Sequence, residues 1–159
     1  DNNLKILNDY SAVKYFIGNF KKNFDKINQN NLKINFLYLQ KFMEYNYKNY
    51  LKKKRFIKFI TLTSLDSFFP NINSVGYSVA KSASSHLILN YQRLHKKTKI
   101  SYFDIQSGAV DTKMRKIKNG NALNITEISK TIEYILSLDD NSNMFPIKIF
   151  PRLKNYSLY

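Results

Sequence analysis

Apolar side chains return every three or four positions in three stretches of the chain. These stretches are residues 33–50, 76–95 and 127–138. The spacing gathers the apolar side chains on one face, so each stretch is predicted to be an amphipathic helix with that face against a core. Residues 1–32 match no clear pattern, but Asp9-Tyr10-Ser11 offers a start signal, and a further helix is expected from there to about Phe24.

Three shorter stretches are predicted to be strands, and the first of them is aromatic, β-branched and nearly continuous in apolar character. They are FIKFITLT at 56–63, KISYFDI at 99–105 and FPIKIF at 145–150. The first run is typical of a strand that is covered on both faces, as in a parallel sheet. The alternation of helices and strands therefore predicts an α/β domain with a parallel sheet, and we expect right-handed crossovers to place helices on both of its faces.

Small polar residues follow two of the predicted strands. Ser64 comes after the first strand, and Ser107 and Gly108 come after the second. Because ligands bind at the carboxyl ends of parallel strands, we expect these residues to line one crevice. Further along, Asn124 and Thr126 are candidates for the N-cap of the last predicted helix.

Composition narrows the class of protein. The chain has 159 residues, which suits a single domain, and 43% of them are hydrophobic, which excludes a disordered tail. It has no Cys and two His, so disulfides, thiolate metal sites and cysteine nucleophiles are excluded and a histidine-based metal site is not expected. No apolar stretch is long enough to span a bilayer and no secretion signal opens the chain, so a cytoplasmic protein is expected.

The formal net charge is +15, from 26 Lys and Arg against 11 Asp and Glu. One interpretation is a nucleic-acid binder, whose affinity falls steeply with salt. The other is an AT-rich genome, because the excess is almost all Lys and accompanies many Asn, Ile, Tyr and Phe, all of which have AT-rich codons. Nucleic-acid readers usually use Arg, which makes bidentate contacts. We therefore predict no nucleic-acid and no membrane partner.

Tyr77 and Lys81 are the residues that carry candidate chemistry. They lie four residues apart near the start of a predicted helix, so their side chains share a face. A phenol normally has a pKa near 10, and a neighbouring ammonium lowers that pKa by favouring the phenolate. A tyrosine tuned in this way can exchange a proton near neutral pH, and a serine hydroxyl at a strand end could hold a substrate oxygen beside it.

The residues around this pair resemble the short-chain dehydrogenase/reductase family. Ser64 precedes Tyr77 by thirteen residues in FITLTSLDSFFPNINSVGYSVAK, as the serine and tyrosine do in that family. The motif continues as SVAKSASSHLILNY, with small residues and a long apolar helix after the lysine. Further similar segments are NLKINFLYLQKFM, ISYFDIQSGAVDTKM and NITEISKTIEYILSL, in the family's order over roughly residues 24–150.

The resemblance implies a Rossmann-like doubly wound sheet and an NAD- or NADP-dependent oxidoreductase. Between the two cofactors we slightly favour NADP. It implies that Ser64 and Tyr77 bind the substrate oxygen, that Lys81 tunes the tyrosine and binds the nicotinamide ribose, and that Asn35 positions a water for proton relay. Gly108, Val110 and Thr112 contact the nicotinamide end, and residues 113–123 close over a small carbonyl or alcohol substrate. A homo-oligomer, such as a dimer through helices 33–50 and 76–95, is also implied.

Each of these residues also has a purely structural interpretation. Ser64 could cap the chain after its strand, Asn35 could bend a helix or bond to a neighbour, and Thr112 could be an ordinary loop hydroxyl. His86 and His95 are interpreted as surface or structural residues.

Two departures from the family pattern lead to a second hypothesis. The family's proline before Gly108 is Ser107 here, and none of the four glycines belongs to a phosphate-binding cluster. The chain is therefore expected to be one partial domain over residues 1–159, with the catalytic half at 33–150 and the N-terminal cofactor-binding half missing. In the alternative hypothesis it is an inactive relative that serves as an assembly partner.

Overall fold

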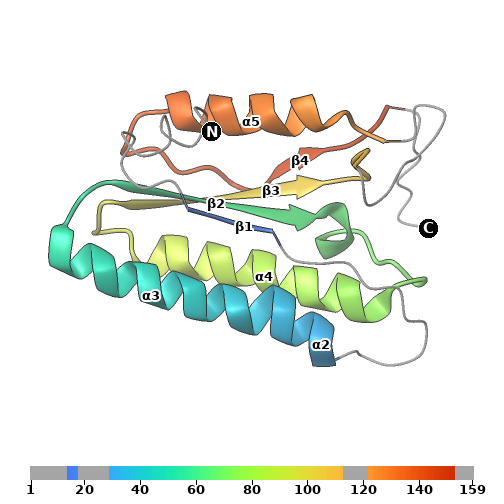
Figure 1. Ribbon diagram of the computed structural model, residues 1–159, viewed down its shortest axis with the longest axis horizontal. Coiled ribbons are helices and arrows are strands. Elements are labelled where there is room, and N and C mark those ends of the chain that lie inside the picture. Colours follow the sequence, from blue (N-terminus) through green and yellow to red (C-terminus); the bar gives the residue numbers. More distant parts are fainter. Residues whose placement is uncertain (1–13, 18–28, 113–121, 153–159) are drawn as a thin grey trace.

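The structure is a computed structural model, and it describes residues 14–17, 29–112 and 122–152. Four strands of the described residues form one sheet in which every neighbouring pair is parallel, in the order β1-β2-β3-β4 (Figure 1). The strands are β1 (Lys14–Ile17), β2 (Ile57–Ser64), β3 (Ile100–Ser107) and β4 (Ile147–Ile149). The predicted α/β class with a parallel sheet is confirmed.

Helices occupy the three stretches that the apolar period predicted, with ends that differ by a few residues. The helices are α2 (Gln29–Leu32), the π-helix η1 (Lys33–Leu37), α3 (Tyr38–Lys53), the 3-10 helix η2 (Leu65–Ser67), α4 (Val75–Leu94) and α5 (Ile125–Ser137). The two short helices α2 and η2 lie outside the predicted stretches. The expected cap of α5 is confirmed, because the side chain of Asn124 accepts a hydrogen bond from the backbone N–H of Thr126 at 3.0 Å.

The helix expected over residues 9–24 is wrong where the structure describes that stretch. Lys14–Ile17 form β1, whose backbone pairs with β2 from Lys14 opposite Phe59 to Ile17 opposite Leu62. A four-residue segment gains little from helix formation, whereas an edge of the sheet satisfies its backbone groups, so tertiary pairing overrides the local signal. Residues 9–13 and 18–24 lie outside the described residues.

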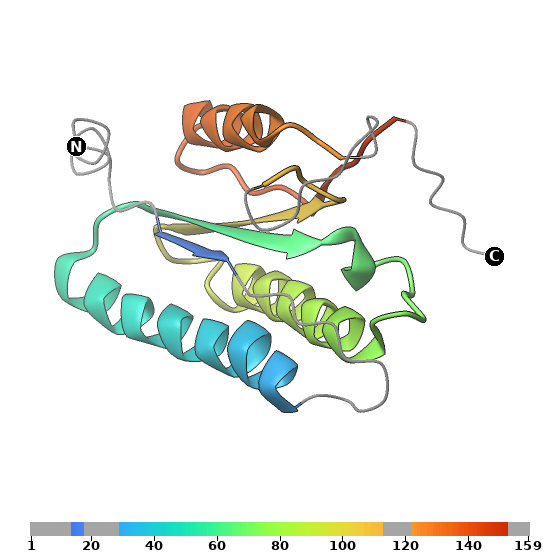
Figure 2. The ribbon, with the colours of Figure 1, turned by 45° about the vertical axis from the view of Figure 1, so that its right-hand side comes forward.

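Helices cover both faces of the sheet, as expected, but not by right-handed crossovers alone. Helices α3 and α4 lie on one face and α5 lies on the other (Figures 1 and 2). The strands follow one another in a single direction, so right-handed crossovers would have put every helix on the same face. The crossover through α5 therefore has the opposite handedness from the crossover through α4. One of the two is a left-handed crossover, which is uncommon.

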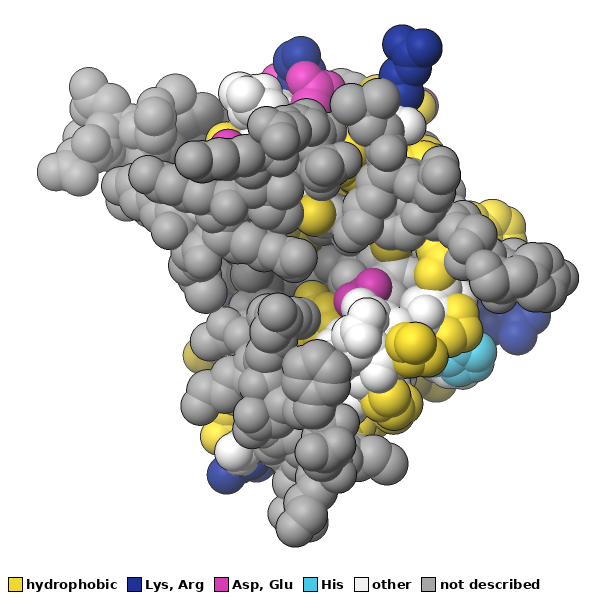
Figure 3. Space-filling view, turned by 90° about the vertical axis from the view of Figure 1, so that its right-hand side faces the viewer, with side chains coloured by type: hydrophobic (Ala, Val, Ile, Leu, Met, Phe, Trp, Pro, Cys, Tyr) yellow, Lys and Arg dark blue, Asp and Glu magenta, His cyan; other side chains and the backbone are white. Residues whose placement is uncertain are grey.

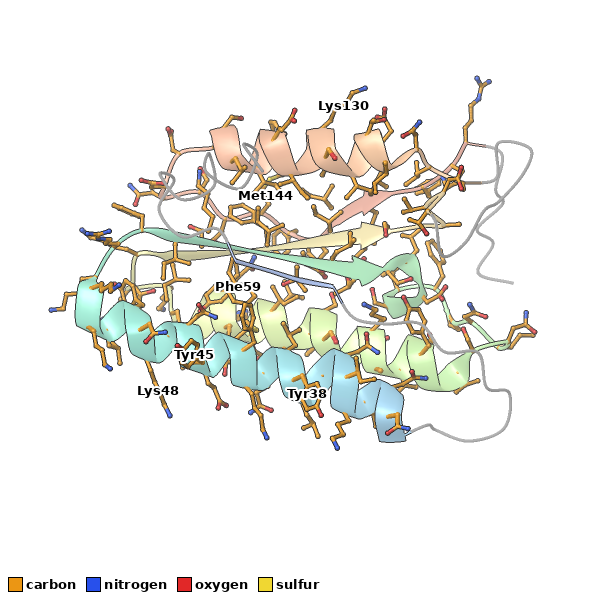
Figure 4. All side chains as sticks on the ribbon, viewed as in Figure 1. Tyr38, Tyr45, Lys48, Phe59, Lys130 and Met144 are labelled. Carbon is orange, nitrogen blue, oxygen red and sulfur yellow. The ribbon has the colours of Figure 1, made fainter. Side chains whose placement is uncertain are left out.

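Two hydrophobic clusters hold the layers together. The cluster between the sheet and helices α3 and α4 includes Phe59, Tyr102 and Ile88, and the cluster under α5 includes Phe103 and Ile135. Figure 4 shows the difference directly, since the labelled Phe59 points into the helix layer and Met144 lies on the α5 side. Every position of β3 is buried, although half of its residues are polar, so this strand carries polar side chains into the interior.

The outer face of α3 carries several exposed apolar and aromatic side chains. Tyr38 is 45% exposed and Tyr45 is 64% exposed, and both point away from the sheet (Figure 4). This face belongs to one of the two helices that the resemblance assigns to oligomer contacts, and oligomerisation stays a prediction. Among the described residues, no helix combines the length and the apolar character that a membrane crossing requires.

Candidate active site

The carboxyl ends of β2 and β3 lie side by side at the same end of the sheet. Ser64 is the last residue of β2, Ser107 is the last residue of β3, and the two are paired in register. The backbone N–H of Gly108 donates a hydrogen bond to Ile149 O at 2.8 Å, which fastens the turn after β3 to β4. The two strand ends predicted to share a crevice are therefore neighbours. Figure 3 looks onto this end, where the described side chains are mostly hydrophobic or neutral and Lys and Arg lie toward the outline.

Ser64 performs a local structural task in the structure. It is the N-cap of η2, and its Oγ accepts a hydrogen bond from the backbone N–H of Asp66 at 3.1 Å. Its carbonyl oxygen accepts a hydrogen bond from Ser67 Oγ. A capping serine hydroxyl accepts with its oxygen and keeps its hydrogen available to donate, so the cap fixes the position of Ser64 without using that hydrogen.

Lys81 is buried beside the ring of Tyr77. Its Nζ lies 5.6 Å from the centroid of that ring, and Lys81 as a whole is only 3% exposed. It donates a hydrogen bond to Leu62 O at 3.4 Å, two residues before Ser64. Burial lowers the pKa of Lys81 to about 8, and the charge of Asp104 opposes that effect. Lys81 is therefore mainly an ammonium at neutral pH, in a place where ammonium groups are rarely found.

Serines of α4 fasten the start of this helix to the turn that follows β2. Ser78 Oγ donates to Asp66 O at 2.5 Å, and Ser82 Oγ donates to Ser67 O at 2.9 Å. Small side chains let the helix approach η2 closely enough for these bonds to form. The start of α4, which carries Tyr77 and Lys81, is therefore bonded to the turn that follows Ser64.

Asn35 lies at the centre of the π-helix η1 and is 1% exposed. The backbone N–H of Tyr38 reaches Lys33 O, five residues back, and Asn35 Nδ2 donates to Asn31 O at 3.0 Å. Ser84 Oγ, one turn after Lys81 on α4, donates to Asn35 O at 2.7 Å. Both structural interpretations of Asn35 are thus present, a helix distortion and a bond to a neighbour, yet π turns are frequent at functional sites.

A buried group of polar side chains lies next to Lys81, and the sequence prediction missed it. We call it the polar block, and its members are Thr61, Thr63, Lys81, Ser85, Asp104 and Gln106, each less than 10% exposed. Asp104 sits in the middle of the buried strand KISYFDI. A charged residue at a buried strand position is rare unless it has partners, and that signal could have identified it from the sequence.

Hydrogen bonds join most of the polar block. Asp104 accepts from Thr63 and Ser85, and Gln106 Nε2 donates to Ser85 Oγ at 2.8 Å. Thr61 Oγ1 and Gln106 Oε1 are buried and have no hydrogen-bond partner among the described residues. Native proteins keep few such atoms, and catalytic sites are one of the places where they are kept.

The residues predicted to contact the nicotinamide end lie on the turn after β3. Val110 forms a parallel bridge with Leu123, and the backbone N–H of Asp111 donates to Leu123 O at 2.8 Å. Gly108 and Thr112 are partly exposed. The predicted substrate loop lies outside the described residues from 113 to 121. In the described part of the chain, no group of three or more His, Cys, Asp or Glu side chains could hold a metal ion.

Sequence comparison finds no similar protein, whereas comparison of structures finds proteins with a similar fold. No family model matches the sequence, and comparison with curated proteins finds no match. A serine dehydrogenase from Escherichia coli superposes with a TM-score of 0.75 at 14% identity, covering 96% of this chain and 72% of that one. The closed form of serine dehydrogenase complexed with NADP+ gives a TM-score of 0.80 at 14% identity, with 97% and 73% covered.

A third similar structure is an alcohol dehydrogenase from the archaeon Thermococcus sibiricus, complexed with 5-hydroxy-NADP. Its TM-score is 0.74 at 18% identity, and the match covers 96% of this chain and 68% of that one. At identities this low, a superposition establishes the fold and leaves the activity open. The chain has the Rossmann-like fold of the short-chain dehydrogenase-type structures that it is similar to.

Proposed function

We propose that the chain is an oxidoreductase that moves a hydride between a nicotinamide cofactor and a carbonyl or alcohol substrate. The observation that carries the proposal is the buried Lys81 ammonium, 5.6 Å from the Tyr77 ring at the carboxyl end of a parallel sheet. Burying a charge costs free energy that partners offset only in part, and a surface lysine would avoid that cost, so a buried lysine points to a function. The similar folds of several dehydrogenases agree with this interpretation.

Within this proposal, Tyr77 is the general acid and base. Its hydroxyl delivers a proton to the substrate oxygen during reduction and removes it during oxidation. Lys81 favours the phenolate by its positive charge. Ser64 donates its free hydrogen to the same substrate oxygen, from a position fixed by its cap on η2. Asn35, anchored to α4 through Ser84, positions a water for proton exchange with Lys81.

The donor set fits the nicotinamide-ribose end of a cofactor. An ammonium has three N–H donors, and Lys81 uses one of them on a described residue, in a long bond to Leu62 O. Its other donors could hold ribose hydroxyls, while Gly108, Val110 and Thr112 line the nicotinamide end. The cofactor, when bound, supplies or accepts the hydride. No glycine cluster in this sequence could approach the pyrophosphate, so these residues account for one end of the cofactor only.

The similar structures bear on the choice of substrate and cofactor. Their names include serine dehydrogenase, acetoin dehydrogenase and alcohol dehydrogenase, with NADP+ or 5-hydroxy-NADP bound in two and NADH bound in 4-hydroxyisoleucine dehydrogenase. For this chain we propose a small alcohol, or the matching carbonyl, and either NAD or NADP. NADP is slightly favoured because the net charge of +15 attracts an additional phosphate.

The test is turnover of reduced cofactor by the protein with a panel of small ketones and aldehydes, and of oxidised cofactor with hydroxy acids and alcohols. We expect Tyr77→Phe to lower kcat by about 10²- to 10⁴-fold, because it removes the proton donor and keeps the ring. Absorbance of the reduced nicotinamide measures the rate.

Tyr134→Phe is the matched control, because Tyr134 is 55% exposed on α5 and should leave kcat unchanged. Binding of NADPH and NADH is measured in parallel by calorimetry. A folded protein that binds neither cofactor contradicts the proposal, and so does a Tyr77→Phe variant with wild-type turnover.

A further inference from the structure

Asp104 is a buried carboxylate in the polar block and is 2% exposed. Its Oδ1 accepts a hydrogen bond from Thr63 Oγ1 at 2.6 Å. Its Oδ2 accepts from Ser85 Oγ at 2.6 Å and from Gln106 Nε2 at 3.3 Å. An ionised carboxylate can accept all three of these bonds, two from hydroxyls and one from an amide N–H. The arrangement therefore fits the charged form.

Helix α4 carries both Lys81 and a residue that donates a hydrogen bond to this carboxylate. Ser85, which donates to Asp104, follows Lys81 by one turn on the same face of the helix. On the strand side, Lys81 Nζ reaches Leu62 O, and Leu62 lies between Thr61 and Thr63 of the polar block. Buried charges act on each other strongly without direct contact, because the protein interior screens them less than water does.

We propose that Asp104 is a positioning residue of the candidate active site, the buried counter-ion that keeps Lys81 protonated beside Tyr77. The proposal rests on the proposed function for the reaction that Lys81 serves, but the relation between the two charges can be measured without turnover. Among the described residues, Asp104 is the charged group whose field acts on Lys81, and Tyr77 is the titratable side chain in contact with it. Asn35, whose backbone oxygen accepts from Ser84 of α4, and Thr61 and Thr63 of the polar block are neutral.

The counter-ion matters because burial acts against the ammonium. Desolvation is the larger effect on Lys81 and lowers its pKa to about 8, and Asp104 is the group that raises it. Conversely, burial raises the pKa of Asp104, while Ser85, Thr63, Gln106 and the charge of Lys81 lower it. Without Asp104 the lysine loses its proton at a lower pH, and Tyr77 then loses the positive charge that favours its phenolate.

The first test compares the wild-type protein with Asp104→Asn. The Cε resonance of Lys81 in protein with isotope-labelled lysine, assigned with Lys81→Arg, should titrate near pH 8 in the wild type and at lower pH in the variant. The alkaline limb of kcat/KM should move in the same direction, with about a tenfold loss at the wild-type optimum. A residue that only supports the fold would lower kcat/KM without moving this limb.

Asp140→Asn is the matched control. Asp140 also faces a lysine, with its Oδ1 3.9 Å from Lys58 Nζ, but the pair is on the opposite face of the sheet from Lys81. The Lys81 titration should be the same in this variant as in the wild type. Because Asp104→Asn could fail to fold, Lys81→Met supplies the reciprocal measurement: the Asp104 Cγ resonance should titrate at higher pH than in the wild type.

The proposal is overturned if the Lys81 titration is unchanged in Asp104→Asn, or if the Asp104 titration is unchanged in Lys81→Met. Reciprocal movement of the two titrations supports it. If both titrations move but the wild-type protein oxidises and reduces nothing in the substrate panel, the counter-ion stands and the proposed oxidoreductase function falls.

Discussion

The space between the sheet and helix α4 is apolar at one end and polar at the other. At the amino ends of the strands, Phe59 and Tyr102 pack with Ile88 of the helix. At the carboxyl ends of the same strands, Asp104 lies with Lys81 and other members of the polar block. The same two strands and the same helix supply both ends. Each of these elements therefore carries apolar residues in one half and polar residues in the other.

The two ends also differ in whether their titratable groups are neutral or charged. In the apolar end, burial lowers the pKa of His95 and raises the pKa of Tyr102, so both side chains are held neutral. In the polar end, Lys81 keeps a pKa of about 8 and Asp104 has three hydrogen-bond donors, so opposite charges are retained. Retaining buried charges costs free energy, and this is how active sites commonly depart from the rules that stabilise a core.

The largest expected change in the free energy of unfolding comes from a substitution in the apolar end. Phe59 is 1% exposed and its ring lies 5.6 Å from Phe42 and 5.7 Å from Tyr102. Phe59→Ala should lower the free energy of unfolding by about 4 kcal/mol, because it removes a buried ring and leaves a cavity. Chemical denaturation measures the change. Phe145→Ala is the control, since Phe145 is 86% exposed, and it should stay within about 0.5 kcal/mol of the wild type.

At the polar end, Lys81→Met is expected to raise the free energy of unfolding, whereas Phe59→Ala lowers it. The pKa of Lys81 falls from 10.5 to about 8 on folding, so the unfolded chain binds this proton more tightly. Folding is therefore opposed at neutral pH, and stability rises as pH increases from about 8 to about 10.5. Removing the charge should raise the free energy of unfolding at neutral pH by less than about 3 kcal/mol, because Asp104 loses the charge that lowers its pKa, while oxidoreductase turnover is lost. A variant less stable than the wild type would show that the charge is not costly there.

The smallest effect concerns His95, which is buried at the end of α4 against the stacked ring of Tyr47. Because burial lowers the pKa of His95, the unfolded chain takes up its proton first as the solution is acidified. Stability from this source is complete above about pH 6.5 and declines below it. His95→Phe should weaken the decline in melting temperature between neutral and mildly acidic pH. His86→Phe, at an exposed position, should leave the wild-type decline in place.

Part of the candidate site could be predicted because it depends on short-range geometry. Tyr77 and Lys81 share a face of any helix, and Ser64 and Ser107 lie at the same end of any parallel sheet that pairs their strands. The position of Asn35 could also be predicted by resemblance, but the π turn around it could not. A carbonyl oxygen within that turn, that of Asn35, accepts a hydrogen bond from Ser84, which lies 49 residues further along the chain.

The sequence by itself determined the class of fold, the main helices and strands and the spacing of the tyrosine and the lysine, because apolar periodicity and helical geometry act over a few residues. Only the tertiary structure decided that Lys14–Ile17 form a strand, that α5 covers the opposite face and that Asp104 lies with Lys81. The physical reason is the same in each case. A strand edge, a crossover and a buried charge are stabilised by partners distant in the chain, and local sequence does not specify which partners will meet.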